Sequence, residues 1–539
     1  MGWMDDETGL DKTEANHLPL TPLSHLRRAR TVFADRDALI DRERHWTYRE
    51  FHADCTRLAS GLTDLGVNPG DVVATLMPNI AAHAIATFGV PAAGAVINTI
   101  NIRLDAGTVA YILDHGQAKV LIADSAFLDL AEKACATMQG QAPRIIEVAD
   151  RNPGHRPSGR HTTWEDLLDG GDPQADWIMP QDEWESIALN YTSGTTGRPK
   201  GVVYHHRGAY LCTLATPISW RMTMYSRLLT IVPLFHCNCW THTWMMPALG
   251  GPVICCRDIT ARNIYDAIAD KGATHFGGAP IILNSLINAK DDERRDLPGT
   301  VEVFVAAAPP PPSTLRAIEE IGFNVTHVYG LTESYGPATE CTWNPDWDGL
   351  DRDGRTDRKS RQGVPMPMNE EIMVLAEDGT PVPWDGKTQG EIGMRGNGLM
   401  KGYYRSPDET AKAFRNGWYM TGDLAVQHPD GYIKIADRAK DIIISGGENI
   451  SSIEVEGCVA GHPAVSLCAV VAKPDDKWGE VPCAFVELKD GKDATAEEII
   501  SYVRERLAGF KTPKEVIFEE LPKTSTGKVQ KYELRKRFG

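Results

Sequence analysis

The first half of the chain alternates between two hydrophobic patterns. Stretches in which apolar residues recur every three or four positions, as on one face of a helix, are followed by short runs that are apolar throughout. Because strands that alternate with helices form parallel sheets covered by helices, this half predicts an α/β fold. The same alternation returns over residues 186–332. We expect helices at 46–65, 81–89 and 106–115, and strands at 72–77, 95–98 and 120–123.

The pattern changes after residue 370, where short strand-like segments are separated by turn residues (EIMVLAEDG, GEIGMRG and GYIKIADR). These segments predict a β-rich subdomain. The residues after 437 are typical of a compact α+β unit, whose helix begins with a capping box formed by Thr495 and Glu498. We therefore predict a large N-terminal domain of layered sheets and helices over residues 1–436, and a small α+β domain over residues 437–539.

Two segments depart from this alternation. Residues 151–171 are rich in Gly, Pro, His, Arg and Asp, and they predict an exposed excursion. Residues 81–97 are the stretch most similar to a membrane span, but they are rich in Ala and Gly and include His83 and Pro91. A buried helix followed by a turn or strand is therefore expected there, rather than a membrane span.

Composition narrows the class of protein. A chain of 539 residues predicts more than one domain, and its 42% hydrophobic and 24% charged content is typical of a soluble globular protein. The net charge of −17 argues against nucleic-acid binding, because no basic field is available to release counterions. The 11 cysteines are odd in number and have no repeating spacing, and the N-terminus is polar and acidic, so we expect reduced thiols in a cytoplasm.

The stretch NYTSGTTGRPKG, at residues 190–201, has the composition of a loop that wraps a phosphate. Its glycines let backbone N–H groups approach an anion, and its hydroxyls add donors. It is not a Walker A loop, because the order of Gly194 and Lys200 does not fit and Gly201 follows the lysine. A solvated surface turn is the alternative for any such loop taken alone.

Four further motifs accompany this loop: YGLTES at 329–334, TGD at 421–423, DRAKDIIISGGENI at 437–450 and PKTSTGK at 522–528. In this order and spacing, the five motifs resemble the AMP-forming acyl-CoA synthetases, an adenylating superfamily. The resemblance runs from Thr47 to Lys528. It implies a large N-terminal domain, a small mobile C-terminal domain, and an active site between the two.

The resemblance implies that the loop holds the pyrophosphate end of ATP. Glu333 would ligate Mg²⁺ together with Thr195. The alternative for this glutamate is an ordinary exposed acid. The residues implied for the loop are Thr192, Ser193, Gly194, Thr195, Thr196, Gly197 and Lys200.

The other two N-terminal motifs are implied to bind the rest of the nucleotide. Tyr329 would stack on adenine beside Gly330, and Thr332 would touch the α-phosphate. Asp423 would accept both ribose hydroxyls with the help of Arg438, although Gly-Asp also favours a simple turn.

The C-terminal motifs are implied to supply the hinge and the catalytic lysine. Lys440 falls at the position about which the small domain turns. Lys528 would place its ammonium between the substrate carboxylate and the α-phosphate, where negative charge gathers in the transition state. Lys523 is the alternative if the register is misplaced, and the last five residues are expected to form a solvated charged end.

The acceptor of the acyl group is implied to be CoA. The segments that contain Ser445, Gly446, Gly447, Glu448 and Trp478 resemble the surfaces of a pantetheine tunnel. A pair of glycines suits a thin pantetheine arm, because side chains would block its close approach to the backbone.

The segment PLFHCNCWTHTW borders the acyl site in the family. His236 would be a gate that closes on the acid before CoA enters, with a buried core histidine as the alternative. Zinc binding by His236, Cys237, Cys239 and His242 is disfavoured, because C-x-C lacks the usual two-residue gap.

The acyl pocket is implied to consist of His236, Trp240, Ala306 and Gly330. Where the family has Gly-Gly-Ala-Pro, this chain has Ala306, Ala307, Ala308 and Pro309, of which the last three would also border ATP. The added methyl groups and the tryptophan reduce the space, so we expect a short or medium acid. LTPLSHLRRA and NTINIRL resemble a subgroup that acts on small acids, and most closely the ligases of methylmercaptopropionate.

We therefore expect an enzyme that joins a short or medium carboxylic acid, with 3-methylmercaptopropionate suspected, to CoA through an acyl-adenylate. It would use ATP, Mg²⁺ and CoA and release AMP and pyrophosphate. Two alternatives stay open: an adenylase that loads a carrier-protein thiol, and a nucleotide-binding regulator without turnover. We expect no nucleic-acid partner, and a homodimer stays open.

Overall fold

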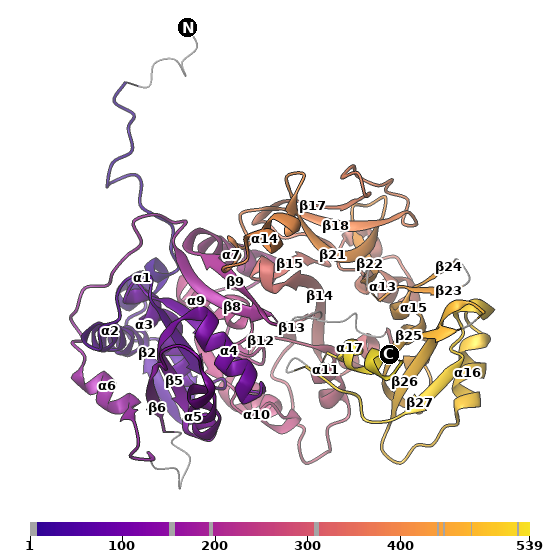
Figure 1. The fold of residues 1–539 in the computed structure, drawn as a ribbon, viewed down its shortest axis with the longest axis horizontal. Helices are drawn as coiled ribbons and strands as arrows, with labels where there is room; N and C mark the ends of the chain where they lie inside the picture. Colours follow the sequence, from indigo (N-terminus) through magenta and orange to yellow (C-terminus); the bar gives the residue numbers. More distant parts are fainter. Residues whose placement is uncertain are drawn as a thin grey trace.

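The computed structural model covers most of the chain. It describes residues 8–149, 157–192, 198–306, 312–438, 441–445, 448–475, 477–524 and 528–538. Figure 1 shows the first helices at one end of the long axis and the C-terminal unit, in yellow, at the other end. The architecture is α/β with a small α+β unit at the C-terminus, which confirms the predicted fold class.

Two large sheets form the N-terminal part. The eight-stranded sheet is parallel except at the end where β8, β9 and β19 pair in antiparallel fashion. Its order is β19 (Gly402–Tyr403), β9 (Lys200–His205), β8 (Ser186–Thr192), β4 (Val96–Thr99), β3 (Val72–Leu76), β5 (Ala118–Asp124), β6 (Arg144–Val148) and β7 (Thr162–Thr163). The nine-stranded sheet has the order β16 (Val364–Pro365), β15 (Gly336–Glu340), β14 (Phe323–Leu331), β13 (Val301–Val305), β12 (His275–Gly278), β10 (Leu228–Thr230), β11 (Val253–Cys255), β1 (Asp37–Asp41) and β2 (Arg44–Thr47).

Two smaller sheets follow. The antiparallel sheet of the β-rich part, which was predicted after residue 370, contains β17 (Asn369–Leu375), β18 (Gln389–Gly396), β21 (Trp418–Gln427), β20 (Phe414–Arg415) and β22 (Ile433–Arg438). The C-terminal sheet contains β24 (Glu448–Ile450), β23 (Ile443–Ser445), β26 (Gly479–Leu488), β25 (Val465–Asp475) and β27 (Glu515–Phe518).

Helices cover the faces of these sheets. In the N-terminal part they are α1 (Leu23–Val32), α2 (Tyr48–Asp64), α3 (Ala81–Ala92), α4 (Ala106–Gly116), α5 (Leu128–Thr137), α6 (Trp164–Gly170), α7 (His206–Ser219), α8 (Cys237–Trp240), α9 (His242–Leu249), α10 (Ala261–Lys271), α11 (Pro280–Ile287), α12 (Pro312–Glu320), α13 (Arg352–Lys359) and α14 (Pro407–Ala413). In the C-terminal part they are α15 (Ser452–Ala460), α16 (Ala496–Arg504) and α17 (Lys531–Arg535).

The predicted elements of the first half are confirmed to within a few residues. The capping box at the start of α16 is also present, because Thr495 and Glu498 bond to each other's backbone N–H. The prediction for residues 151–171 is wrong in its second part. There Thr163 caps α6, and α6 buries Trp164 and Leu167 in the main core, so this segment is not all surface excursion.

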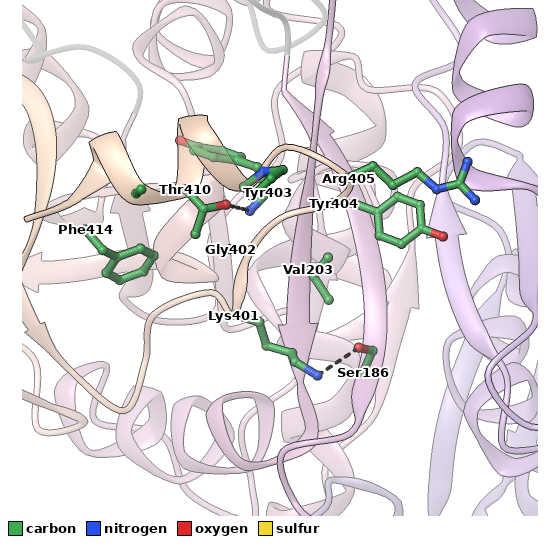
Figure 2. Close-up of a pocket in the computed structure, with 11 residues that line it drawn as sticks. Ser186, Val203, Lys401, Gly402, Tyr403, Tyr404, Arg405, Thr410 and Phe414 are labelled. Atoms are coloured by element: carbon green, nitrogen blue, oxygen red, sulfur yellow. Dashed lines mark hydrogen bonds between the residues drawn. The ribbon is translucent and has the colours of Figure 1, made fainter.

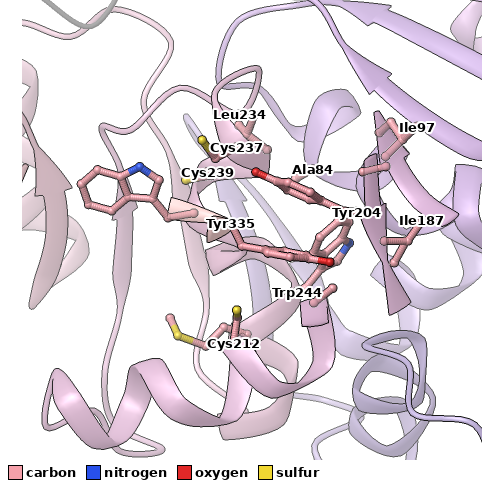
Figure 3. Packing of buried hydrophobic residues seen from close by; sticks show 14 of the residues in the cluster. Ala84, Ile97, Ile187, Tyr204, Cys212, Leu234, Cys237, Cys239, Trp244 and Tyr335 are labelled. Atoms are coloured by element: carbon pink, nitrogen blue, oxygen red, sulfur yellow. The ribbon is translucent and has the colours of Figure 1, made fainter. Parts of the chain in front are cut away.

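The main hydrophobic core lies around α3, whose residues are all buried. Small residues allow this, since a Cβ on Gly89 would meet a methyl group of Leu58 at 2.6 Å. In the same core, Tyr204 and Tyr335 stack at 3.9 Å, close to Cys212 and Trp244 (Figure 3). The buried helix predicted at this position is confirmed. Within the described ranges, none of the helices combines the length and apolar character needed to cross a membrane.

Candidate active site

Three segments meet around Glu333, which lies in the short 3₁₀ turn Thr332–Ser334. The Tyr403 hydroxyl donates to Glu333 Oε1 at 2.8 Å, and the Met400 backbone N–H donates to the Glu333 carbonyl at 2.8 Å. The Tyr204 hydroxyl donates to the Thr332 carbonyl at 2.6 Å. The YGLTES turn is therefore held against β9 and β19 of the eight-stranded sheet, beside the hairpin of β8 and β9.

The surroundings of Glu333 favour a cation. Burial raises the pKa of Glu333, and the hydrogen bond from Tyr403 and the charge of Lys200 oppose that rise. A carboxylate that is kept ionised in a poorly solvated place gains most when a cation approaches it. The residues present therefore fit the Mg²⁺ that ATP carries, because hard cations prefer carboxylate oxygens.

Lys200, the lysine of the loop motif, is paired with an acid in this conformation. Its ammonium lies 2.5 Å from Glu409 Oε2 of α14 and 5.0 Å from the centre of the Tyr403 ring. The hydrogen bond from Lys200, followed by that from Lys412, lowers the pKa of Glu409 to about 2. Lys200 therefore shares its positive charge with Glu409, at the position opposite Thr192 in the β8–β9 hairpin.

The strand that contains Tyr403 also lines a pocket of about 540 Å³ (Figure 2). Here Thr410 Oγ1 accepts the Tyr403 backbone N–H at 2.9 Å, which anchors α14 on β19. Lys401 Nζ donates to Ser186 Oγ at 3.3 Å. Because α14 provides Glu409, this anchor fixes the distance between Glu409 and Lys200.

Two residues implied for the nucleotide lie together. The Tyr329 hydroxyl, from β14, donates to Asp423 Oδ2, from β21, at 2.7 Å. Both side chains are almost fully buried, and the backbone of Asp423 lies opposite that of Arg438 in the register of β21 and β22. The fold thus brings YGLTES and TGD to one place, although 94 residues separate the two partners.

Close backbone approach requires glycine beside these residues. A Cβ on Gly330 would lie 1.8 Å from the Gly336 carbonyl oxygen, so no larger residue fits the YGLTES turn. Gly336 has φ +114°, and its Cβ would lie 2.7 to 2.9 Å from atoms of Trp240. A Cβ on Gly277 would meet the Trp240 ring at 2.6 Å. Trp240 therefore fills the space between β12 and β15.

The residues implied for the acyl pocket gather at the carboxyl ends of parallel strands, where α/β sheets bind their ligands. Ala306 follows β13, and its N–H donates to the Gly278 carbonyl at 3.1 Å. Trp240 lies against β12, as described above. His236 is partly buried, and burial lowers its pKa to about 4, so its imidazole is neutral at pH 7.

The backbone between His236 and His242 is left-handed. Residues 237–241 have φ between +49° and +63°, although none of them is glycine. The left-handed conformation costs about 1–2 kcal/mol per residue, so tertiary contacts must hold it. Cys239 Sγ donates to the Val232 carbonyl at 3.2 Å, and Cys237 Sγ lies 3.6 Å from Thr332 Oγ1. The described residues contain no group of three or more His, Cys, Asp or Glu that could hold a metal ion.

The two lysines that are candidates for the catalytic role, Lys523 and Lys528, have different contacts in the C-terminal unit. Thr524 Oγ1 accepts the Lys528 backbone N–H at 3.1 Å, and the Thr524 N–H donates to the Lys528 carbonyl at 2.7 Å. Lys523 Nζ is paired with Glu487 at 2.7 Å on the C-terminal sheet. Because the ammonium of Lys523 is already paired with Glu487, Lys528 is the better candidate for the catalytic role.

The surface implied for CoA lies at one end of the C-terminal sheet. Ser445, at the end of β23, pairs with Glu448 of β24 and with Gly479 of β26. Trp478 precedes this glycine and is 45% exposed, with Lys477 Nζ 4.7 Å from the centre of its ring.

Eleven of the implied residues lie outside the described part of the chain: Ser193, Gly194, Thr195, Thr196, Gly197, Ala307, Ala308, Pro309, Lys440, Gly446 and Gly447. The backbone of Arg438 is described, but its side chain is not.

Tyr403 and Glu409 were missed by the sequence analysis. Their segment, GLMKGYYRSPDE, shows only a glycine before two aromatic residues and an acidic helix start, which predict a buried turn and a cap.

Comparisons with known proteins show the family of the chain. The AMP-binding enzyme family matches residues 26–404, and the AMP-binding enzyme C-terminal domain matches residues 454–528. A peroxisomal acetate/butyrate–CoA ligase of Arabidopsis thaliana is 46% identical, over 99% of this chain and 97% of its own length. A 2-methylpropanoate–CoA ligase of Humulus lupulus is 45% identical, over 97% of this chain and 95% of its own length.

Two solved structures share the whole fold. An anthranilate CoA ligase in complex with anthranoyl-AMP has a TM-score of 0.85 at 24% identity, over 98% of this chain and 99% of its own. The o-succinylbenzoate CoA synthetase of Bacillus subtilis, in complex with an acyl-adenylate, has a TM-score of 0.80 at 26% identity. The match covers 95% of this chain and 97% of that one. The chain belongs to the AMP-binding enzyme family and is an AMP-forming acid–CoA ligase. Enzymes of this class take ATP, CoA and a carboxylic acid as substrates.

Proposed function

We propose that the protein joins a short-chain carboxylic acid to CoA through an acyl-adenylate. The observation that supports a short chain is the position of Trp240, whose ring fills the space between Gly277 and Gly336. We assign this space to the acyl end of the site. The names of two relatives, an acetate/butyrate ligase and a 2-methylpropanoate ligase, support the same size of acid.

In the first half-reaction, the carboxylate of the acid attacks the α-phosphorus of ATP and pyrophosphate leaves. Both reactants are anions, so the chain must supply positive charge and fixed geometry. We assign Lys528 to the charge that develops at the α-phosphate, and Glu333 to the Mg²⁺ that arrives with ATP. The hydrogen bond from Tyr403 favours the ionised form of Glu333 and orients its carboxyl group, and we assign the binding of the nucleoside to Asp423 and Tyr329.

In the second half-reaction, the thiol of CoA attacks the carbonyl carbon of the adenylate and AMP leaves. We assign the binding of ATP and the acid to domain 1–436, and the catalytic Lys528 and the CoA surface around Ser445 and Trp478 to domain 437–539. His236 is neutral, because burial lowers its pKa to about 4, so it can border a carboxylate or a thioester without forming an ion pair.

Within the short acids, we propose 3-methylmercaptopropionate as one substrate. The chain of this acid is one heavy atom longer than that of butyrate. Its thioether sulfur is polarisable, and such a sulfur makes favourable contacts with an aromatic ring such as that of Trp240. The resemblance of LTPLSHLRRA and NTINIRL to the ligases of this acid supports the choice. We propose a cytoplasmic location, although four relatives are named as peroxisomal.

The test is CoA-dependent AMP release with a panel of acids: acetate, butyrate, 2-methylpropanoate, 3-methylmercaptopropionate, pentanoate, benzoate and octanoate. We expect kcat/KM to be highest among the short acids and about 100-fold lower for octanoate. Pentanoate has the chain length of the thioether acid, so a preference for the thioether over pentanoate reports the sulfur itself. AMP release that does not require CoA, or that is fastest with octanoate, contradicts the proposal.

A further inference from the structure

Asn238 lies in the middle of the left-handed turn, between His236 and Trp240. Its side chain is fully buried, and its Nδ2 donates to Asn190 Oδ1 at 3.2 Å. Asn190 belongs to β8 and lies two residues before Thr192, which is implied to bind phosphate. One hydrogen bond thus joins the turn that borders the acid to the strand that leads into the phosphate loop.

The acceptor atom of this bond is fixed from a second side. Thr99 Oγ1, at the end of β4, donates to the same Asn190 Oδ1 at 3.1 Å. Asn190 Nδ2 and Asn238 Oδ1 are buried, and among the described residues neither has a hydrogen-bond partner. The side-chain oxygen of Asn190 therefore accepts both of the hydrogen bonds described for the side-chain amide, and Nδ2 takes part in none of those described.

The turn needs such contacts, because its backbone conformation is unfavourable on its own. The three side chains of residues 237–239 each contact a different part of the site. Cys237 contacts Thr332 of YGLTES, Asn238 contacts Asn190, and Cys239 contacts the loop at Val232. Segments that contain residues implied to bind ATP hold the turn from both sides, and His236 directly precedes the turn while Trp240 belongs to it.

We propose that the hydrogen bond from Asn238 to Asn190 makes the binding of the acid and the binding of ATP depend on each other. ATP bound at the end of β8 fixes Asn190, Asn190 holds the turn through Asn238, and the turn sets the positions of His236 and Trp240 around the acid. By thermodynamic linkage, the acid must then strengthen ATP binding by the same factor. Asn190 and Asn238 are positioning residues. The inference rests on the proposed function.

The central comparison of the test is between a variant of Asn190 that keeps the acceptor oxygen and one that lacks it. Asn190→Asp keeps an oxygen for Thr99 and Asn238 and replaces only the nitrogen that bonds to nothing described. Asn190→Leu has a similar shape but no acceptor. Asn238→Gly removes the donor and suits the left-handed backbone. Thr241→Gly relaxes the same turn and leaves the bond intact, so it is the matched control.

The readout is the dissociation constant of the non-hydrolysable analogue α,β-methylene-ATP, with Mg²⁺, measured by calorimetry with and without saturating butyrate. We expect butyrate to tighten binding at least about 5-fold in the wild type, in Asn190→Asp and in Thr241→Gly. We expect less than about 2-fold in Asn190→Leu and Asn238→Gly. The double variant Asn190→Leu/Asn238→Gly should be no weaker than the single variants.

Three results overturn the proposal: no effect of butyrate in the wild type, wild-type coupling in Asn190→Leu, or equal loss in Asn190→Asp and Asn190→Leu. Melting temperatures show whether each variant is folded, and Asn238→Gly tests the same bond from the donor side if Asn190→Leu does not fold. Acid-dependent AMP release by the wild type tests the proposed function separately, so an active enzyme without coupling contradicts this inference alone.

Discussion

The Tyr403 hydroxyl donates a 2.8 Å hydrogen bond to Glu333 Oε1, and the two residues are 70 positions apart in the chain. Glu333 is the acid implied to bind Mg²⁺, and burial is the main influence that raises its pKa. Tyr403 works against that influence, because a hydrogen bond to a carboxylate stabilises the ionised form.

Tyr403→Phe should therefore raise the pKa of Glu333 further and move the acidic limb of the pH–rate profile upward. A hydrogen bond to a charged group is worth about 1.5–3 kcal/mol, which is enough for the upward shift to be measured. The measurement is kcat/KM for ATP between pH 5 and 9. Tyr404→Phe is the control, since the neighbouring residue keeps the strand intact. Profiles of Tyr403→Phe and wild type that coincide would show that this bond does not control ionisation.

Removing the partner of Lys200 should strengthen ATP binding. Glu409→Gln leaves the ammonium of Lys200 without the carboxylate at 2.5 Å, so more of its charge is available to the pyrophosphate. Because the pair is partly exposed and screened, we expect the KM for ATP to fall only about 2- to 5-fold. Asp408→Asn removes the neighbouring acid of α14 and should leave the KM unchanged. A higher KM in Glu409→Gln would mean that Glu409 orients Lys200 instead of competing for it.

Trp240→Ala should lengthen the acyl pocket. The space that the ring occupies against Gly277 and Gly336 becomes available to substrate, so kcat/KM for hexanoate and octanoate should rise about 10-fold or more while that for butyrate falls. The loss of a buried tryptophan should also lower stability by about 3–5 kcal/mol.

Gly277→Ala is the opposite change, because its methyl group would press on the ring at 2.6 Å. It should reduce activity toward butyrate more than toward acetate. An unchanged chain-length profile in Trp240→Ala would place the end of the acyl pocket elsewhere.

Lys528→Ala should abolish adenylation and leave ATP binding nearly unchanged. Removing a charge that acts mainly in the transition state lowers kcat by about 100- to 1,000-fold with little effect on ground-state affinity. The measurements are acid-dependent pyrophosphate exchange and calorimetric ATP binding. Lys523→Ala should retain exchange, because Lys523 is paired with Glu487. The reverse pattern would transfer the catalytic role to Lys523.

Buried histidines should make the fold sensitive to acid. Burial lowers the pKa of His83 from 6.5 to about 4, and its ring contacts Thr75 Oγ1 and the Pro78 carbonyl. Below pH 6.5 the unfolded chain binds a proton that the folded chain does not, so stability falls as the pH falls from 6.5 to 4. This one group should remove about 3 kcal/mol over that range.

The measurement is urea denaturation at pH 7, 5.5 and 4.5 for wild type and His83→Gln. The variant should be less stable at pH 7 but should lose less on acidification. His45→Gln, at an exposed position, should follow the wild type. A variant with the same pH slope as wild type would show that His83 does not cause the acid sensitivity.

Local patterns were enough to predict many elements. Thr495 with Glu498 forms the predicted capping box, and α16 begins directly after Thr495. The helix predicted from residue 46 begins at Tyr48, after a second capping box formed by Thr47 and Glu50. Residues 151–171 show the limit of such patterns. Their polar composition predicted an excursion, but Trp164 and Leu167 of α6 are buried, because the main core accepts the apolar face of even a short helix.

The sequence by itself determined the class of enzyme and the residues that resemble its motifs, because motifs such as NYTSGTTGRPKG and YGLTES are local and their chemistry depends on residue types at short spacing. Only the tertiary structure decided how these residues are connected. The contacts of Asn190 with Asn238, of Glu333 with Tyr403 and of Lys200 with Glu409 join positions 48, 70 and 209 residues apart. No local pattern predicts such pairs. The left-handed turn at 237–241 also depends on its surroundings, since five non-glycine residues adopt that conformation only where packing and hydrogen bonds outweigh its intrinsic cost.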